Sequence, residues 1–116
     1  MILNRDNILK ADDLKRETIT IAQWGGDVIV SQFGGADRDI YDGKLLAISN
    51  DPTAMAGLRA LVCSLALVDE TGAKLFTPDD IDQLGKKSDE ALTLIFTTAQ
   101  KINGLGWQAE DDAKKN

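Results

Sequence analysis

Carboxylates and a single thiol are the side chains of this sequence whose types could do chemistry. Convergent carboxylates can bind divalent cations, and a facing pair can act as general acid and base. Five acidic residues fall close together in the second half of the chain: Asp69, Glu70, Asp79, Asp80 and Asp82. The chain has no His and one Cys, so the preferred zinc ligands and the usual nucleophile–histidine pairs are missing from its composition.

The spacing of the acidic residues favours turns and helix caps over a metal or acid/base site. A calcium loop needs oxygen ligands at alternate positions, a central Gly and a closing Glu, which residues 69–82 do not supply. Residues 77–80, Thr-Pro-Asp-Asp, instead match the start of a helix, because Thr caps, Pro fits the first position and acids favour the positive end of the dipole. Residues 69–72 are predicted to form a turn. We therefore expect no metal, no cofactor and no catalytic residue.

The remaining candidates for chemistry are equally weak. Cys63 has apolar neighbours, which predicts a buried and inert thiol. The paired glycines at 25–26 and 34–35 are not followed by Lys-Ser or Lys-Thr, so they do not match a phosphate-binding loop. The sequence therefore favours a protein that is not an enzyme.

Composition indicates one small soluble domain that meets other proteins. The chain has 116 residues, 43% of them hydrophobic, and a formal net charge of −6, which argues against nucleic-acid binding. The longest apolar run, residues 54–68, is broken by Arg59 and Ser64 and is shorter than a membrane span. Charges interrupt the first residues before a signal peptide could form, so we expect a cytosolic protein.

The predicted fold class is mainly α: a small helical domain with an N-terminal β-hairpin, covering residues 1–105, and a flexible polar tail at 106–116. β-branched residues alternate with polar ones on both sides of Gly25-Gly26, which predicts a hairpin over residues 17–32. Apolar spacing, caps and breakers predict five helices, near residues 4–13, 36–48, 53–68, 78–84 and 89–103.

The helix at 53–68 is apolar nearly all round, so it should be central or covered by a partner. The predicted core combines it with the last helix: Leu58, Leu61, Leu65, Phe76, Leu92, Ile95 and Phe96. Aromatic and apolar side chains also suggest four protein–protein contact residues: Trp24, Leu61, Leu65 and Trp107. Two alternatives remain open, that the helix is simply the core and that Trp24 folds back over its own hairpin.

The order of the segments resembles the tail assembly chaperones of long-tailed, siphovirus-type bacteriophages. The similarity covers essentially the whole chain and depends on WGGDVIV, on a Gly-x-x-Arg-Asp step at residues 35–39, on VDETGAKLFTPDDIDQLGKKS and on a final helix ending in Ile-Asn-Gly-Leu. Residues 33–52 depart from the family pattern, which leaves the packing of the middle helix open.

The resemblance implies a non-enzymatic chaperone that works in the host cell cytoplasm during virion morphogenesis. It would bind the tape measure protein, keep that long helical protein soluble, help recruit tail-tube subunits and be absent from the mature virion. This chain would be the short form, and a longer form made by a ribosomal frameshift would reach the tail-tube protein. We also expect self-association, including head-to-tail contacts, because the apolar helix and the hairpin edge lack an obvious cover. Neither nucleic acid nor membrane is an expected partner.

The alternative is a small acidic adaptor or inhibitor that binds a host protein, for instance by mimicking the charge of nucleic acid. A mimic should concentrate its negative charge on one face. In this sequence acids are spread along the chain and mixed with Lys, as at residues 86–87 and 114–115. This pattern favours the chaperone hypothesis over the adaptor.

Overall fold

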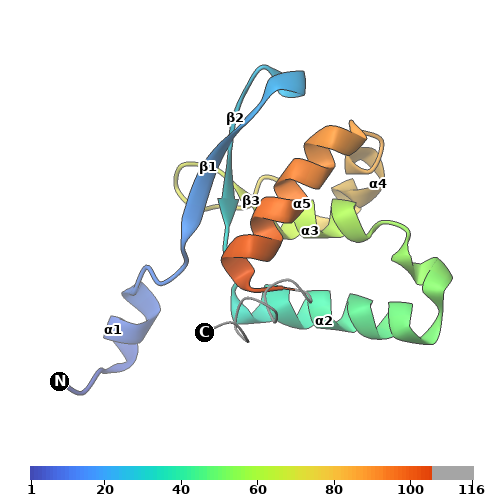
Figure 1. Ribbon diagram of the computed structural model, residues 1–116. Coiled ribbons are helices and arrows are strands. Elements are labelled where there is room, and N and C mark those ends of the chain that lie inside the picture. Colours follow the sequence, from blue (N-terminus) through green and yellow to red (C-terminus); the bar gives the residue numbers. More distant parts are fainter. Residues whose placement is uncertain (106–116) are drawn as a thin grey trace, which may run out of the picture.

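The computed structural model describes residues 1–105, and its first regular unit is the hairpin (Figure 1). Strands β1 (Arg16–Ile21) and β2 (Gly26–Ser31) pair antiparallel, with Ile19 opposite Val28. A 3₁₀ turn, η1 (Ala22–Trp24), joins them, and Gly25 closes the loop with a φ of 73°. The predicted hairpin is confirmed, and Gly25 supplies the positive φ that the loop requires.

A third strand completes the sheet, in the order β1-β2-β3. Strand β3 (Leu67–Val68) pairs antiparallel with β2, and Val68 also forms an isolated bridge with Lys74. The sequence predicted helices with a hairpin alone, so the prediction of a mainly helical fold was wrong about the sheet, although helices do predominate. A strand of two residues is too short to show a period-two pattern, which is why β3 was missed.

Within residues 1–105 there are five α-helices, in chain order α1 (Arg5–Lys10), α2 (Gly35–Asn50), α3 (Leu58–Ala66), α4 (Ile81–Leu84) and α5 (Asp89–Asn103). Two further 3₁₀ turns, η2 (Pro52–Met55) and η3 (Pro78–Asp80), precede α3 and α4. Helix α5 packs between α3 and the hairpin, while α2 runs beneath them and α1 stands away from the rest (Figure 1). None of the described helices is long and apolar enough to cross a membrane.

The helix predicted at 53–68 is interrupted, and this part of the prediction was wrong. Residues 52–55 form η2, Ala56 leaves helical geometry with a ψ of 131°, and Gly57 has a φ of 84°. An α-helix needs negative φ at every residue, so α3 begins only at Leu58. The predictions at 36–48, 78–84 and 89–103 are confirmed within a few residues, while α1 is shorter than its predicted span.

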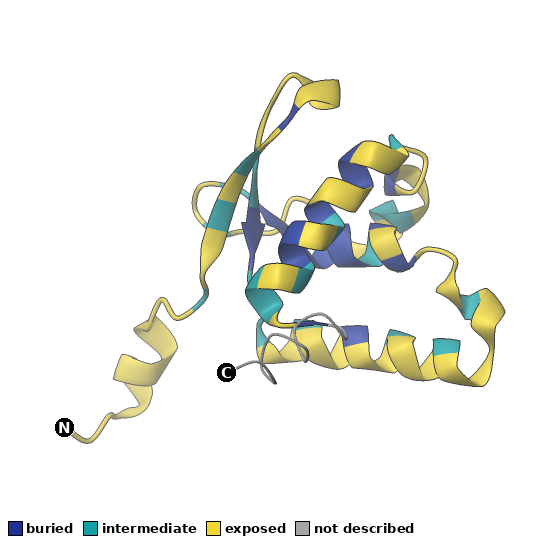
Figure 2. Cartoon of the chain, in the orientation of Figure 1, coloured by how far each residue is buried: buried dark blue, intermediate teal, exposed yellow. Residues whose placement is uncertain are grey.

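The core lies between the sheet, α3 and α5 (Figure 2). Its largest fully buried side chains are Ile21, Val30, Val62, Cys63, Leu67 and Ile95. Four predicted core residues are buried: Leu58, Leu65, Leu92 and Ile95. The other three, Leu61, Phe76 and Phe96, are half-buried and pack against this cluster. The sequence did not predict that Phe33 and Tyr41 join the core as a ring pair with centroids 5.9 Å apart.

Glycine substitutions should test the break before α3. Gly57→Ala should destabilise the protein by about 1–2 kcal/mol, because an L-residue must adopt left-handed backbone there while its Cβ meets nothing within 4 Å. The matched control Gly43→Ala, within α2 and equally free of clashes, should stabilise it by about 0.5–1 kcal/mol. Chemical denaturation measures both changes. Stabilisation by Gly57→Ala would show that α3 continues through residue 57.

Adjacent residues on α5 should test the core. Ile95 is fully buried, so Ile95→Ala should cost about 2–5 kcal/mol of unfolding free energy. Leu94 is 44% exposed, and Leu94→Ala should cost no more than about 0.5 kcal/mol. Equal losses in urea unfolding would contradict the orientation of α5.

Candidate protein-binding surfaces

The first acidic group closes a turn. The Oδ1 atom of Asp69 accepts hydrogen bonds from the Thr71 hydroxyl at 2.6 Å, the Thr71 N–H at 2.8 Å and the Ala73 N–H at 3.1 Å. These bonds, with that of the Thr71 hydroxyl first, hold the pKa of Asp69 below its usual value. The predicted turn at 69–72 is confirmed, and the Asp69 carboxylate is used within it.

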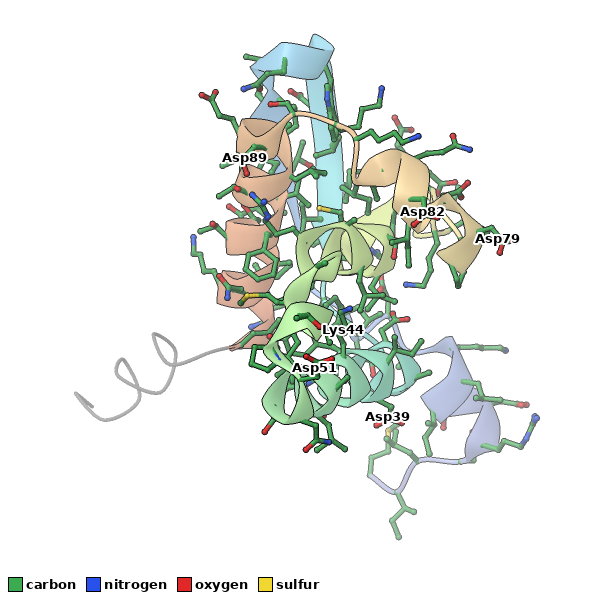
Figure 3. The ribbon with its side chains drawn as sticks, turned by 90° about the vertical axis from the view of Figure 1, so that its right-hand side faces the viewer. Asp39, Lys44, Asp51, Asp79, Asp82 and Asp89 are labelled. Atoms are coloured by element: carbon green, nitrogen blue, oxygen red, sulfur yellow. The ribbon has the colours of Figure 1, made fainter. Side chains whose placement is uncertain are left out.

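The second acidic group starts a helix. The Oδ2 atom of Asp80 accepts a hydrogen bond from the Thr77 N–H at 2.8 Å, and Thr77 precedes η3 with Pro78 in its first position. Asp79 and Asp82 lie apart on the exposed surface (Figure 3). Within residues 1–105, no three Asp, Glu, His or Cys side chains come together as a group that could hold a metal ion.

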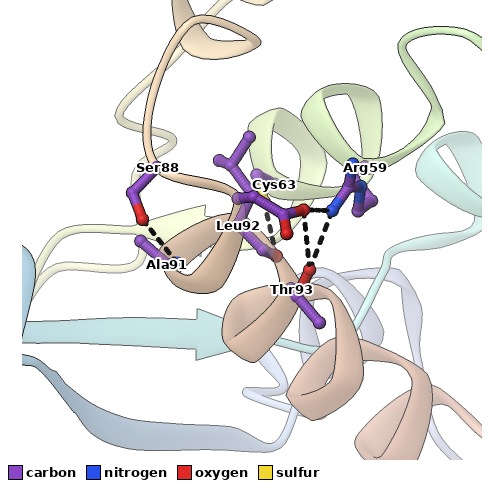
Figure 4. Close-up of polar contacts among 7 residues, drawn as sticks. Arg59, Cys63, Ser88, Ala91, Leu92 and Thr93 are labelled. Carbon is purple, nitrogen blue, oxygen red and sulfur yellow. Dashed lines mark hydrogen bonds and ion pairs between the residues drawn. The ribbon is translucent and has the colours of Figure 1, made fainter.

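Cys63 is a buried thiol of the core, as predicted. Its Sγ donates a weak hydrogen bond of 3.7 Å to the Leu92 carbonyl (Figure 4). Burial raises the pKa of Cys63 to about 12, against the opposing effect of the nearby Arg59 guanidinium. The thiol is therefore protonated at neutral pH, and its position does not suit a nucleophile.

Arg59 joins the start of α3 to the start of α5. Its guanidinium contacts the Asp89 carboxylate and donates a 2.9 Å hydrogen bond to the Thr93 hydroxyl (Figure 4). The side chains of Arg59 and Asp89 are 48% and 77% exposed, so water screens the pair and its contribution to stability is small. The contact places one basic and one acidic group at the edge of an apolar hollow.

An apolar hollow of about 390 Å³ lies between η2, the first turn of α3, Gly85 and α5. We call it the η2–α3 groove. Its lining residues are Met55, Ala56, Gly57, Leu58, Arg59, Ala60, Gly85, Leu92 and Phe96. The backbone leaves helical geometry at Ala56 and Gly57, within its wall. The sequence did not predict the groove, because the predicted helix continued through Gly57. A single Gly within an apolar helical pattern was the available signal that the helix breaks there.

Trp24 lies at the hairpin tip and borders a second hollow, of about 300 Å³, that Phe76 and Leu84 also line. Trp24 is 37% exposed, so its side chain is neither fully exposed to solvent nor buried against its own hairpin. The neighbouring Gln23 donates a 2.9 Å hydrogen bond to Glu90 of α5, which links the tip to the helical side. Trp24 is therefore held above a partly apolar surface and can still be reached from solvent.

The other predicted contact residues lie elsewhere. Leu65 is buried in the core at 8% exposure, and Leu61 is half-buried against it. Neither contributes to the η2–α3 groove or to the hollow at Trp24. Trp107 and the predicted flexible tail at 106–116 lie outside the described residues. The role of these residues in protein–protein contacts stays a prediction.

The Cys63 thiol should make stability depend on alkaline pH. Burial raises its pKa to about 12 in the folded protein, above the ordinary value of 9.0, so from about pH 9 the unfolded chain loses this proton first. Stability should therefore fall as pH rises from about 9 to 12, by up to about 1.4 kcal/mol per pH unit from this group. Urea unfolding at several pH values should show a shallower decline for Cys63→Ala. An identical slope in both proteins would contradict the assignment.

Comparisons with known proteins identify a fold but not a family. No family description and no curated protein matches the sequence. Among solved structures, the chain is similar to one titled "Structure of bacteriophage HK97 tail assembly chaperone", with a TM-score of 0.63 and 11% sequence identity. The match covers 88% of this chain and 95% of that chain. The protein therefore has a fold like that of a phage tail assembly chaperone along almost the whole length of the known structure.

Proposed function

We propose that the protein is a non-enzymatic tail assembly chaperone of a long-tailed, siphovirus-type phage. The supporting observation is the fold similarity, which spans 95% of the HK97 chaperone chain. The segments behind the sequence resemblance also have clear structural positions. WGGDVIV forms the hairpin tip and most of β2, and the segment from Val68 begins in β3 and includes the Asp69 turn.

In this proposal the protein binds the tape measure protein in the host cytoplasm and keeps it soluble until tail-tube subunits assemble around it. It is then absent from the finished virion. The protein also self-associates, and a longer form made by ribosomal frameshifting carries the contact with the tail-tube protein. These steps need binding surfaces and no catalytic group.

The two apolar hollows provide a physical basis for binding a long helical partner. An amphipathic helix binds by inserting apolar side chains, spaced three or four residues apart, into hollows of its receptor. The hollow at Trp24 has an aromatic side chain at its edge and charged groups beside it, including Asp80 and Lys87. Aromatic residues in such positions often contribute much of the binding energy. Trp24 is therefore the proposed anchor for the tape measure protein.

The alternative, an acidic adaptor or inhibitor of a host protein, has less support. Several acids are paired with bases on the surface, including Asp37 with Lys74 at 2.8 Å and Asp42 with Arg38 at 3.1 Å. These pairs interrupt the continuous negative surface that a mimic of nucleic acid would need.

Co-expression with the tape measure protein of the same genome tests the proposal. The tape measure protein should be soluble, and should co-purify with this chain, only when both are present. Trp24→Ala should weaken the complex at least about tenfold, because it removes a large aromatic anchor. The control Leu94→Ala changes a comparably exposed residue on α5 and should leave binding unchanged.

A tape measure protein that stays insoluble with the wild-type chain would contradict the proposal. Thermal melts of each variant establish that it remains folded. Capture of a host protein in place of the tape measure protein would support the adaptor instead.

A further inference from the structure

The N-terminal arm, which we define as residues 1–11, has large apolar side chains that contact no core. Ile2, Leu3, Ile8 and Leu9 are 96%, 56%, 58% and 66% exposed. No residue of α1 is buried, and the arm stands away from the body of the molecule (Figures 1 and 2). The arm is anchored where Lys15 and Gln32 exchange two hydrogen bonds of 2.8 Å.

The helix in this arm is too short to be stable alone. Helix α1 has six residues, and its N-terminus is closed by a reciprocal capping box between Asn4 and Asn7. Isolated helices shorter than about 12–15 residues are marginally stable in water, because the entropy cost of nucleation is large and a short helix forms few hydrogen bonds to offset it. Capping adds only about 1 kcal/mol. Burial of Ile8 and Leu9 on another surface would supply the missing stability.

The η2–α3 groove has the apolar character that such an arm needs, and it lies on the opposite side of the molecule. In Figure 1 the arm extends from the foot of β1, whereas η2 and the start of α3 are at the far side. The groove contains Met55, which is 60% exposed, and the half-buried Phe96. An arm and a groove on opposite sides of one chain suit contacts between successive copies.

Charge also favours the contact between arm and groove. The arm contains two bases, Arg5 and Lys10, and one acid, Asp6, in a chain whose net charge is −6. The face that carries the groove displays the carboxylates of Asp51 and Asp82 together with the ammonium of Lys44 (Figure 3), and Arg59 in the groove lining is paired with Asp89. The unpaired carboxylates on this face attract a weakly basic segment, which steers association and helps to fix its orientation.

We propose that the N-terminal arm of one copy docks in the η2–α3 groove of a second copy. Ile8 and Leu9 enter the apolar hollow beside Met55 and Phe96, and α1 is stabilised by this burial. Each copy then offers a free arm at one end and a free groove at the other, so the contact is head-to-tail and can extend to rings or open chains. This proposal deepens the self-association included in the proposed function by naming the two surfaces.

Matched aspartate variants of the full chain test the arm. Leu9→Asp should raise the apparent dissociation constant of self-association at least about tenfold, because it removes an apolar side chain and places a carboxylate in an apolar contact. The control Leu46→Asp, at a residue of α2 that is 65% exposed, adds the same charge and should change it by no more than about twofold. Light scattering over a concentration series measures both constants.

Disulfide trapping tests the contact itself. Oxidation of a mixture of Leu9→Cys and Met55→Cys chains should give a mixed covalent dimer, whereas Leu46→Cys with Met55→Cys should not. The natural Cys63 is fully buried and should not react. Weaker association in Leu9→Asp together with the mixed dimer supports the proposal.

Oligomers that are insensitive to Leu9→Asp, without the mixed dimer, would overturn docking of the arm and leave self-association by another surface. A monomeric mass up to about millimolar concentration would overturn both. Neither result bears on solubilisation of the tape measure protein, which the co-expression experiment measures separately.

Discussion

Helix α3 is buried on nearly every side, and the other elements are arranged to cover it. Seven of its nine residues are buried, and several are small, including Ala60, Cys63 and Ala66. Small side chains let neighbouring elements approach closely, while the apolar composition makes exposure to water costly. Helix α5 covers one side, α4 another, and the chain passes directly from α3 into β3, which brings the sheet against the same core.

Because the other elements pack around α3, apolar side chains elsewhere in the chain stay exposed to solvent. The chain changes direction at Ala56 and Gly57 to enter α3, and the η2–α3 groove lies at this bend. At the opposite side, α1 is separated from the core by the stretch that leads into β1. A small domain has a high ratio of surface to volume, so it cannot bury every apolar residue. The η2–α3 groove, the hollow at Trp24 and the N-terminal arm are apolar surfaces that this arrangement leaves exposed.

Two of the five acidic residues that first suggested chemistry, Asp69 and Asp80, have local structural roles. Asp69 accepts three hydrogen bonds within its turn, and Asp80 accepts one at the start of η3. Carboxylates that are bonded to neighbouring N–H and O–H groups are held apart, and they do not converge on a common point in the described residues.

The sequence by itself determined the features that depend on neighbours along the chain. Alternating β-branched residues and Gly25 specified the hairpin, and residues 69–72 specified their turn. Helix α5 was specified by its apolar stripe and by Ser88, whose hydroxyl caps the helix by accepting a hydrogen bond from the Ala91 N–H. Period and capping act over a few residues. The burial of Cys63 could also be predicted from its apolar neighbours.

Only the tertiary structure decided how these elements pack against one another. Strand β3 exists because β2 lies beside Leu67 and Val68, and Leu65 is buried because other elements of the fold cover it. The sequence could indicate that the segment around Leu61 and Leu65 was apolar, but not which side chains would remain at a surface. The groove beside Gly57 and the separation of the arm from it likewise depend on contacts between residues far apart in the chain, which local patterns do not encode.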